Sequence, residues 1–335
     1  MSRLWSGALR LTTTWTIASF SALALASAPA LAKDTGYIFV SNEKSHFLTV
    51  LDPNTYEVVQ EIKTSRRPRD MHFNKDKTLI YVACGDDDVI DIIDVAKLEV
   101  VDQIPTSPSP EAFTFDPEEK FIYVSNEEDS SLSIIDIAAK IIIKDVPTGA
   151  EPEGVALSED ASTVYVTSEV ADMVHFIDTE GGYVTDNVVV GTRPRRIVLT
   201  PDGKYLWVTA ELSGEIYIID RDTVEIVEVI NFLPPGFRQV DVTPVGLILT
   251  RDGKTAFVAL GRANHIAIVD VEKRETLAYL LVGVRAWGVQ LSRDEKMLYV
   301  ANGLSDDISI VDVNRRRVIK SVPVGRIPYG ILVDD

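Results

Sequence analysis

The chain contains little cysteine and histidine, and it lacks the motifs of common hydrolases. Cys84 is the only cysteine among 335 residues, so neither an internal disulfide bond nor a C-x-x-C-H haem attachment site can form. The four histidines are not spaced as metal ligands usually are. A Gly-x-Ser-x-Gly nucleophile motif is also missing. These absences favour a binding protein over an enzyme.

The first 32 residues contain no acidic side chain. Arg3 and Arg10 precede a stretch of small apolar residues, and Ala30-Leu31-Ala32 matches a signal peptidase cleavage site. We therefore expect residues 1–32 to be a secretory signal peptide and residues 33–335 to be a single domain. Several Thr and Ser residues dilute the apolar stretch, so a membrane anchor is the less favoured alternative and we expect no membrane span after cleavage.

Basic residues are scarce relative to acidic ones. The chain has 33 Lys and Arg against 51 Asp and Glu, and its net charge is −18. Cleavage would remove Arg3 and Arg10 and bring the charge to −20. Such a chain repels nucleic acids and anionic membranes. The charge is compatible with a basic partner or a cation, and equally with solubility alone.

A repeat with a period of 42 residues, interrupted by a single step of 50, runs through the chain. Valine, aspartate and proline each recur with this spacing. The valines are Val40, Val82, Val124, Val166, Val208, Val258 and Val300; the aspartates are Asp52, Asp94, Asp136, Asp178, Asp220, Asp270 and Asp312; the prolines are Pro68, Pro110, Pro152, Pro194, Pro244 and Pro328, with Ala286 in the sixth place. All three series share one insertion, which we assign to residues 231–243.

Each repeat contains four short segments rich in β-branched and aromatic residues, such as 163–167 and 173–177. Four strands in about 42 residues are typical of one β-propeller blade. The chain after residue 32 begins with a second-strand segment, 37–40, and ends with an extra first-strand segment, 330–333. We therefore predict an all-β, seven-bladed β-propeller of four-stranded blades, closed by pairing of the N- and C-terminal segments in one blade. An open solenoid is the alternative, but it would leave sheet edges exposed.

Residues 298–302 (Leu-Tyr-Val-Ala-Asn) and 122–126 (Ile-Tyr-Val-Ser-Asn) resemble the YVTN repeat. Segments 298–312 and 321–335 resemble the PQQ-dependent catabolism-associated β-propeller proteins, and the resemblance extends over residues 33–335. It implies a periplasmic protein that works beside pyrroloquinoline quinone (PQQ)-dependent alcohol dehydrogenases and c-type cytochromes. It does not imply a particular reaction. More distant relatives of this family include haem d1-binding and lactonase propellers.

Arginine and aromatic residues cluster in the loops that lead into the innermost strands. These loops and those between second and third strands should share one face of a propeller, at the mouth of its central channel. The candidate binding residues there are Arg69, Glu111, Glu153, Arg193, Arg195, Arg285, Trp287, Arg326 and Tyr329. Arginine binds carboxylates and aromatic rings stack on flat ligands, so we predict a site for a small planar anion such as PQQ. In the alternative, the arginines pair with Glu111, Glu151 and Glu153 in a structural ring.

The other polar groups favour structural roles. Acidic residues at 86–88, 127–129 and 306–307 suggest a solvated rim, with Ca²⁺ binding as the alternative. The repeated aspartates should cap turns. We assign His72 and His175 to the core, whereas His46 or His265, beside loops, is an alternative axial haem ligand. Cys84 should be unreactive, because Asp86, Asp87 and Asp88 disfavour its thiolate.

Three functions are compatible with these features. The first is a periplasmic binding or accessory protein for PQQ-dependent alcohol oxidation, whose partner is an alcohol dehydrogenase or a cytochrome c. The second is a lactonase-like hydrolase, for which we expect Glu111, Glu153, Arg69 and Arg195 to converge at the mouth. The third is a protein-interaction scaffold. No residue pattern requires a cofactor.

Overall fold

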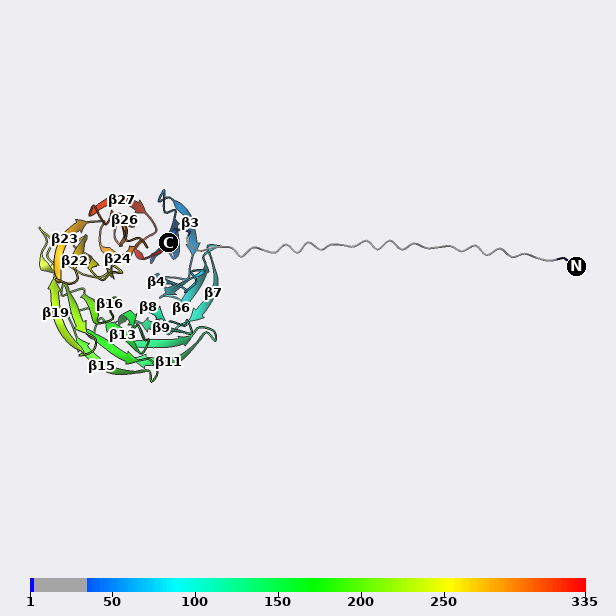
Figure 1. Ribbon diagram of the computed structural model, residues 1–335, viewed down its shortest axis with the longest axis horizontal. Coiled ribbons are helices and arrows are strands. Elements are labelled where there is room, and N and C mark those ends of the chain that lie inside the picture. The colour runs from blue at the N-terminus through cyan, green and yellow to red at the C-terminus, as the bar shows by residue number, and fades with distance from the viewer. Residues whose placement is uncertain (3–34) are drawn as a thin grey trace. The chain divides into compact units, whose positions relative to one another are not determined.

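The computed structural model describes residues 1–2 and 35–335, so the predicted signal peptide lies outside the described residues except for its first two. Within residues 35–335, 28 strands form seven antiparallel sheets of four strands each. Figure 1 shows these sheets arranged in a ring, with the chain colour advancing around it. The prediction of a seven-bladed β-propeller is confirmed.

In every blade the four strands follow one another from the central channel outward. Blade 1 contains β28 (Pro328–Val333), β1 (Ile38–Asn42), β2 (Phe47–Leu51) and β3 (Val58–Lys63); blade 2, β4 (Pro68–Phe73), β5 (Leu79–Cys84), β6 (Val89–Asp94) and β7 (Glu99–Pro105); blade 3, β8 (Pro110–Phe115), β9 (Phe121–Asn126), β10 (Ser131–Asp136) and β11 (Ile141–Pro147). Blade 4 contains β12 (Pro152–Leu157), β13 (Thr163–Ser168), β14 (Met173–Asp178) and β15 (Tyr183–Val189); blade 5, β16 (Pro194–Leu199), β17 (Tyr205–Ala210), β18 (Glu215–Asp220) and β19 (Glu225–Asn231). Blade 6 contains β20 (Leu247–Leu249), β21 (Thr255–Ala259), β22 (His265–Asp270) and β23 (Glu275–Leu281); blade 7, β24 (Ala286–Leu291), β25 (Met297–Asn302), β26 (Asp307–Asp312) and β27 (Arg317–Pro323).

The core consists of apolar layers between neighbouring blades. One layer joins Phe39 and Val50 of blade 1 to Met71 and Val82 of blade 2. Middle strands such as β5 are therefore buried on both faces, which explains their nearly continuous apolar sequences. Outer strands such as β11 have one solvent-facing side.

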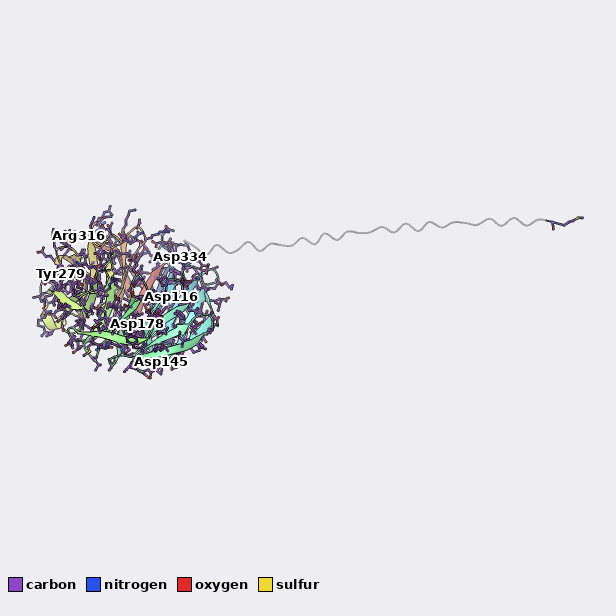
Figure 2. All side chains as sticks on the ribbon, turned by 60° about the horizontal axis from the view of Figure 1, so that its bottom comes forward. Asp116, Asp145, Asp178, Tyr279, Arg316 and Asp334 are labelled. Carbon is purple, nitrogen blue, oxygen red and sulfur yellow. The ribbon has the colours of Figure 1, made fainter. Side chains whose placement is uncertain are left out.

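The ring closes as predicted, because β28 pairs with β1 in blade 1. Asp334, labelled in Figure 2, follows the strand, and its backbone N–H donates to the Tyr37 carbonyl at 3.0 Å. Its carboxylate accepts hydrogen bonds from the backbone N–H and the hydroxyl of Thr35, at 2.8 and 2.6 Å. Residues from the two ends of the described propeller thus complete one sheet.

The insertion at residues 231–243 packs against blades 5 and 6. Phe232 and Val242 lie in one apolar cluster with Trp207 and Leu260. The insertion contains the only helix of the described residues, a 3₁₀ turn η1 (Gln239–Asp241). No helix among the described residues is long and apolar enough to cross a membrane. The insertion also shortens the following inner strand, since β20 has three residues where the other six inner strands have six.

The repeated aspartates cap turns, as predicted. Asp178, labelled in Figure 2, ends β14, and its carboxylate accepts a hydrogen bond of 2.5 Å from the Gly181 backbone N–H. The equivalent carboxylates of Asp52, Asp94, Asp136, Asp220, Asp270 and Asp312 accept backbone hydrogen bonds in the same way. The aspartate column is therefore a feature of the fold.

Candidate functional site

The loops that precede the inner strands hydrogen-bond to the loops between second and third strands of the same blade. The Glu127 N–H binds the Ser109 carbonyl, and the Glu211 N–H binds the Arg193 carbonyl, at 2.8 and 2.9 Å. Both sets of loops thus lie on one face of the ring, which we call the arginine face. The loops between first and second strands lie at the other ends of the strands, on the opposite face.

Six arginines and six glutamates interact on the arginine face, and we call them the Arg–Glu cluster. Its members are Arg67, Arg69, Arg193, Arg195, Arg196, Arg285, Glu43, Glu111, Glu127, Glu153, Glu169 and Glu211. Because the cluster contains as many glutamates as arginines, it places no large excess of positive charge at the mouth of the channel. The sequence pattern had suggested such an excess.

The first half of the cluster is organised by two arginines of blade 2. Arg67 contacts Glu43 at 3.7 Å, Glu111 at 2.7 Å and Glu127 at 3.0 Å. Arg69 binds the other Glu111 oxygen at 2.6 Å and Glu153 at 3.1 Å. Alternating charges therefore lead from blade 1 to blade 4.

The second half of the cluster continues from Glu153 into blade 5. Arg195 contacts Glu153 at 3.1 Å and also pairs with Glu169. Glu169 and Glu211 both contact Arg193, at 2.5 and 3.4 Å. Arg285 of blade 7 then ends the series with a 3.3 Å contact to Glu211. The chain of ion pairs is an open arc that starts at Glu43 and ends at Arg285.

The two central glutamates respond oppositely to this environment. Burial outweighs Arg69 and raises the pKa of Glu111 well above its ordinary value, and the nearby Glu153 adds to this effect. Burial would also raise the pKa of Glu153, but Arg195, Arg69 and Arg196 lower it to about 2. Both side chains are almost fully buried, so neither Glu111 nor Glu153 can contact a substrate in this conformation.

Most of the predicted site residues come together. Arg69, Glu111, Glu153, Arg193, Arg195 and Arg285 belong to the Arg–Glu cluster, and Trp287 and Tyr329 pack on its guanidinium groups. Arg326 does not join it; its side chain is exposed, and its backbone N–H donates to the Ser45 hydroxyl at 2.8 Å. Glu151, named in the ion-pair alternative, makes no salt bridge among the described residues.

Four glutamates of the cluster were missed as site residues, although the repeat could have revealed them. Glu43, Glu127, Glu169 and Glu211 occupy one column, directly after the second strand of their blades. The other three blades carry Gly85, Gly261 and Gly303 there. Glu127, which the sequence pattern placed in a solvated acidic rim, instead contacts Arg67 at 3.0 Å.

The gap in the arc holds a cavity of about 210 Å³. Its lining contains both ends of the ion-pair arc, Glu43 and Arg285, together with Trp287, Tyr329 and Gly303. A Cβ added at Gly303 would have no neighbour closer than 3.7 Å. The absent glutamate side chain at this column position thus contributes to the open space.

The aromatic residues form one wall of this cavity and support the arginines. The guanidinium carbons of Arg195 and Arg285 lie 5.0 and 4.7 Å from the Trp287 ring centroid. The Tyr329 hydroxyl accepts hydrogen bonds from Arg69 and Arg196, at 2.9 and 2.5 Å. The Trp287 indole N–H is buried and has no acceptor among the described residues.

Close packing of inner strands fixes Tyr329 in this position. A Cβ added at Gly288 of β24 would lie 2.1 Å from the Tyr329 carbonyl oxygen of β28. Only glycine permits this approach. Tyr329 and Arg196 also line a separate cavity of about 160 Å³ within the central channel, together with Asp70 and His72.

His72 was wrongly assigned to the core. Its side chain is 41% exposed, because β4 is an innermost strand, and it contacts Asp70 at 3.0 Å. His175 is buried, as predicted, while His46 accepts a hydrogen bond from the Arg67 N–H through Nδ1 at 3.0 Å. The described residues contain no group of three or more His, Cys, Asp or Glu that could hold a metal ion.

Cys84 is buried, and burial raises the pKa of its thiol well above the ordinary value. The largest carboxylate effect on the thiol comes from Asp91, whose Oδ2 lies 3.7 Å from Sγ, rather than from Asp86 or Asp88. Both observations agree with an unreactive thiol.

The described residues thus form a seven-bladed β-propeller with an Arg–Glu cluster and a small cavity on one face. Residues 179–318 match the family model described as "Lactonase, 7-bladed beta-propeller". A search of curated proteins found no match. The matched segment lies in blades 4 to 7 and resembles lactonase propellers of the YVTN type.

Solved structures with the same fold have diverse functions. Hydrazine synthase from Kuenenia stuttgartiensis is 22% identical with a TM-score of 0.75, covering 84% of this chain and 93% of that one. The periplasmic gluconolactonase PpgL from Pseudomonas aeruginosa is 19% identical with a TM-score of 0.75, covering 89% and 98%. The dihydro-heme d1 dehydrogenase NirN is 15% identical with a TM-score of 0.69, covering 92% and 78%. At these identities the similarity concerns the fold.

Proposed function

We propose that this protein is a lactonase-like hydrolase that opens small, uncharged lactones in the cavity on the arginine face. The observation that carries this proposal is the position of Glu43 and Arg285, the two ends of the ion-pair arc, in the lining of one cavity. The match of residues 179–318 to the lactonase propeller family supports it.

Glu43 is suited to act as a general base. It is the cluster carboxylate with the weakest pairing, since its nearest cationic contacts among the described residues are Arg67 at 3.7 Å and Lys44 at 3.9 Å. A carboxylate in this state can accept a proton from a water molecule as the water attacks the lactone carbonyl carbon. The protonated Glu43 can then return that proton to the ring oxygen when the C–O bond breaks, leaving a hydroxy acid.

Arg285 is suited to stabilise the negative charge that develops on the carbonyl oxygen. A guanidinium placed in advance lowers the barrier because it needs no reorganisation during the reaction. The Trp287 ring forms part of the cavity wall beside Arg285, while its indole N–H is buried. One acid and one base in a cavity of about 210 Å³ fit a small ring without its own charge. A phosphorylated lactone would bring charge that the paired arginines do not balance.

The test is lactone hydrolysis followed in a pH-stat, with glucono-δ-lactone and γ-butyrolactone as six- and five-membered rings. We expect Glu43→Gln and Arg285→Gln each to lower kcat/KM by about 100-fold. Gly303→Gln should raise KM by filling the cavity. Glu128→Gln, which changes an exposed carboxylate on the same face, should match the wild type.

Hydrolysis no faster than in buffer, for both lactones, would refute the proposal. Full activity of Glu43→Gln would refute the assigned role of Glu43. Circular dichroism of each variant establishes that the fold is retained.

The second candidate is a periplasmic accessory protein of PQQ-dependent alcohol oxidation, which binds PQQ, an alcohol dehydrogenase or a cytochrome c. The sequence resemblance and the Trp287 side chain beside the cavity support it. PQQ should then quench wild-type tryptophan fluorescence, and Trp287→Phe should lose this response. A titration that is flat up to millimolar PQQ excludes PQQ as the ligand.

A further inference from the structure

A second and larger cavity lies on the opposite face, and we call it the basic vestibule. Its volume of about 540 Å³ falls in the range typical of small-molecule sites, about 300–1,000 Å³. It extends across blades 6, 7, 1 and 2, at the ends of β20, β24, β28 and β4. Gln290 and Leu332 line both this vestibule and the channel cavity, so the vestibule lies at the far end of the channel from the arginine face.

The lining of the vestibule is basic, although the chain has a net charge of −18. Lys75, Lys77, Arg251 and Arg293 contribute four positive charges, and Glu295 and Asp335 contribute two negative ones. Basic side chains thus outnumber acidic ones in this lining. The equivalent loops of blades 3 and 4 carry acidic residues instead, at 118–119 and 159–160.

Both carboxylates in the vestibule are held by the loops themselves. A Glu295 oxygen accepts a hydrogen bond of 2.7 Å from the Arg251 backbone N–H and lies 3.4 Å from its guanidinium Nε. An Asp335 oxygen accepts one of 2.7 Å from the Arg293 backbone N–H. Lys75 is exposed and makes no side-chain ion pair with another described residue. Lys77 Nζ donates a hydrogen bond of 2.7 Å to the Asp335 main-chain oxygen, so Lys75 and the loosely held Arg251 guanidinium are the cationic groups that can contact a ligand.

The vestibule also has apolar walls. Phe73, Ile248, Leu249, Leu291 and Leu332 line it, and all except Leu291 are only half-buried. A ligand that covers this surface would remove apolar area from water, which contributes about 25 cal/mol per Å². A fully hydrated inorganic ion would leave these walls exposed.

We propose that the basic vestibule binds a small organic anion that carries one carboxylate on an apolar body. Lys75 and Arg251, from blades 2 and 6, would contact the carboxylate, and the half-buried apolar side chains would contact the body. This site goes beyond the proposed lactone site and does not depend on it. The ligand classes differ because six arginines of the arginine face are already engaged by six glutamates of the Arg–Glu cluster.

The probe is 2-naphthoate, titrated into the wild-type protein by isothermal calorimetry, with uncharged 2-naphthalenemethanol as the matched ligand. We expect saturable binding of one naphthoate that weakens as salt is added, and no comparable binding of the alcohol. Lys75→Gln with Arg251→Gln should weaken binding at least about tenfold. The control pair Lys254→Gln with Lys296→Gln removes the same charge from exposed positions that do not line the vestibule, although their loops border it. It should change binding less than about twofold.

The proposal is overturned if wild-type protein binds no naphthoate at millimolar concentration, if the alcohol binds equally well, or if both double variants lose affinity to the same extent. Equal loss would indicate attraction by overall charge. Lactone hydrolysis by Lys75→Gln with Arg251→Gln should stay at the wild-type level. The experiments on naphthoate binding and on lactone hydrolysis therefore test the vestibule and the lactone site independently. If that double variant melts early, the salt dependence and the alcohol control still decide the question on wild-type protein.

Discussion

Arg195 is the residue whose substitution should best reveal the structural part played by the Arg–Glu cluster. It is buried and contacts Glu153 and Glu169, which are buried as well. We expect Arg195→Ala to lower the free energy of unfolding by about 3–5 kcal/mol, because it leaves buried carboxylates without a partner. Urea unfolding followed by circular dichroism measures the change.

Arg326→Ala is the matched control, since Arg326 lies on the same face but is exposed and outside the cluster. It should alter stability by less than about 0.5 kcal/mol. Equal effects of the two substitutions would show that the ion pairs contribute little.

His175 lies in a hydrogen-bonded series that resembles a catalytic triad in its chemistry. Its Nε2 is 2.9 Å from the Ser168 hydroxyl, and its Nδ1 is 2.5 Å from the Asn187 side-chain oxygen. The Gly149 N–H also donates to Nε2, and Ser168 is fully buried. Blade 3 carries a similar series, Asn126–Ser133–Asp145, at the equivalent positions. The His175 series is therefore structural.

His175 should make stability depend on pH near neutrality. Burial lowers its pKa below the ordinary 6.5, and the hydrogen bond with Asn187 only partly opposes this. The unfolded chain then binds a proton more readily than the folded protein. The stability contributed by neutral, buried His175 is therefore fully present above pH 6.5 and is lost as pH falls from 6.5 toward the lowered pKa. Between about pH 7.5 and 5.5 the wild type should lose more unfolding free energy than His175→Gln. Equal losses of unfolding free energy in the wild type and His175→Gln would contradict a role of His175 in this pH dependence.

Individual loops connect each blade to the next through side chains as well as backbone groups. Asp88, Asp172 and Asp306 adopt left-handed backbone conformations between second and third strands. Each accepts a hydrogen bond from a backbone N–H just before the next inner strand, those of Ser109, Arg193 and Ile327. Asp88 and Asp306, which the sequence pattern assigned to a solvated rim, thus connect neighbouring blades.

The insertion should behave as part of the core of blades 5 and 6. Phe232 is fully buried, whereas its neighbour Leu233 is 54% exposed. Phe232→Ala should cost about 3–5 kcal/mol of unfolding free energy, because it leaves a cavity in the cluster. Leu233→Ala should stay within about 0.5 kcal/mol. Two nearly unchanged denaturation curves would mean that the insertion is dispensable.

For the whole propeller, closure of the ring should control stability. Deletion of residues 330–335 removes Ile331 and Val333, which are buried between blades 7 and 1, and these two side chains alone contribute about 3–6 kcal/mol. It also exposes the edge of β1. We expect a large drop in Tm by calorimetry. Asp334→Ala, which removes the side-chain contacts with Thr35 and leaves β28 in place, should give a smaller drop.

The columns of the repeat predicted the strands, the turn-capping aspartates, the number of blades and the pairing of β28 with β1. They also predicted which loops share a face, and so brought most candidate site residues together. Arg326 stayed outside the cluster with its side chain exposed to solvent, and His72 proved half-exposed because β4 borders the channel. These outcomes depend on side-chain direction at single positions, which a shared repeat position does not specify.

The sequence by itself determined the architecture, because 42-residue periodicity, alternating apolar segments and complementary terminal segments allow only a closed ring to bury every blade. It also placed arginine on one face. Only the tertiary structure decided how those charges are used: it paired six arginines with six glutamates from different blades, left the arc open between Glu43 and Arg285, and formed a cavity there beside Gly303. The physical reason is that these contacts join residues far apart in the sequence, and their geometry is set by the packing of blades around the axis.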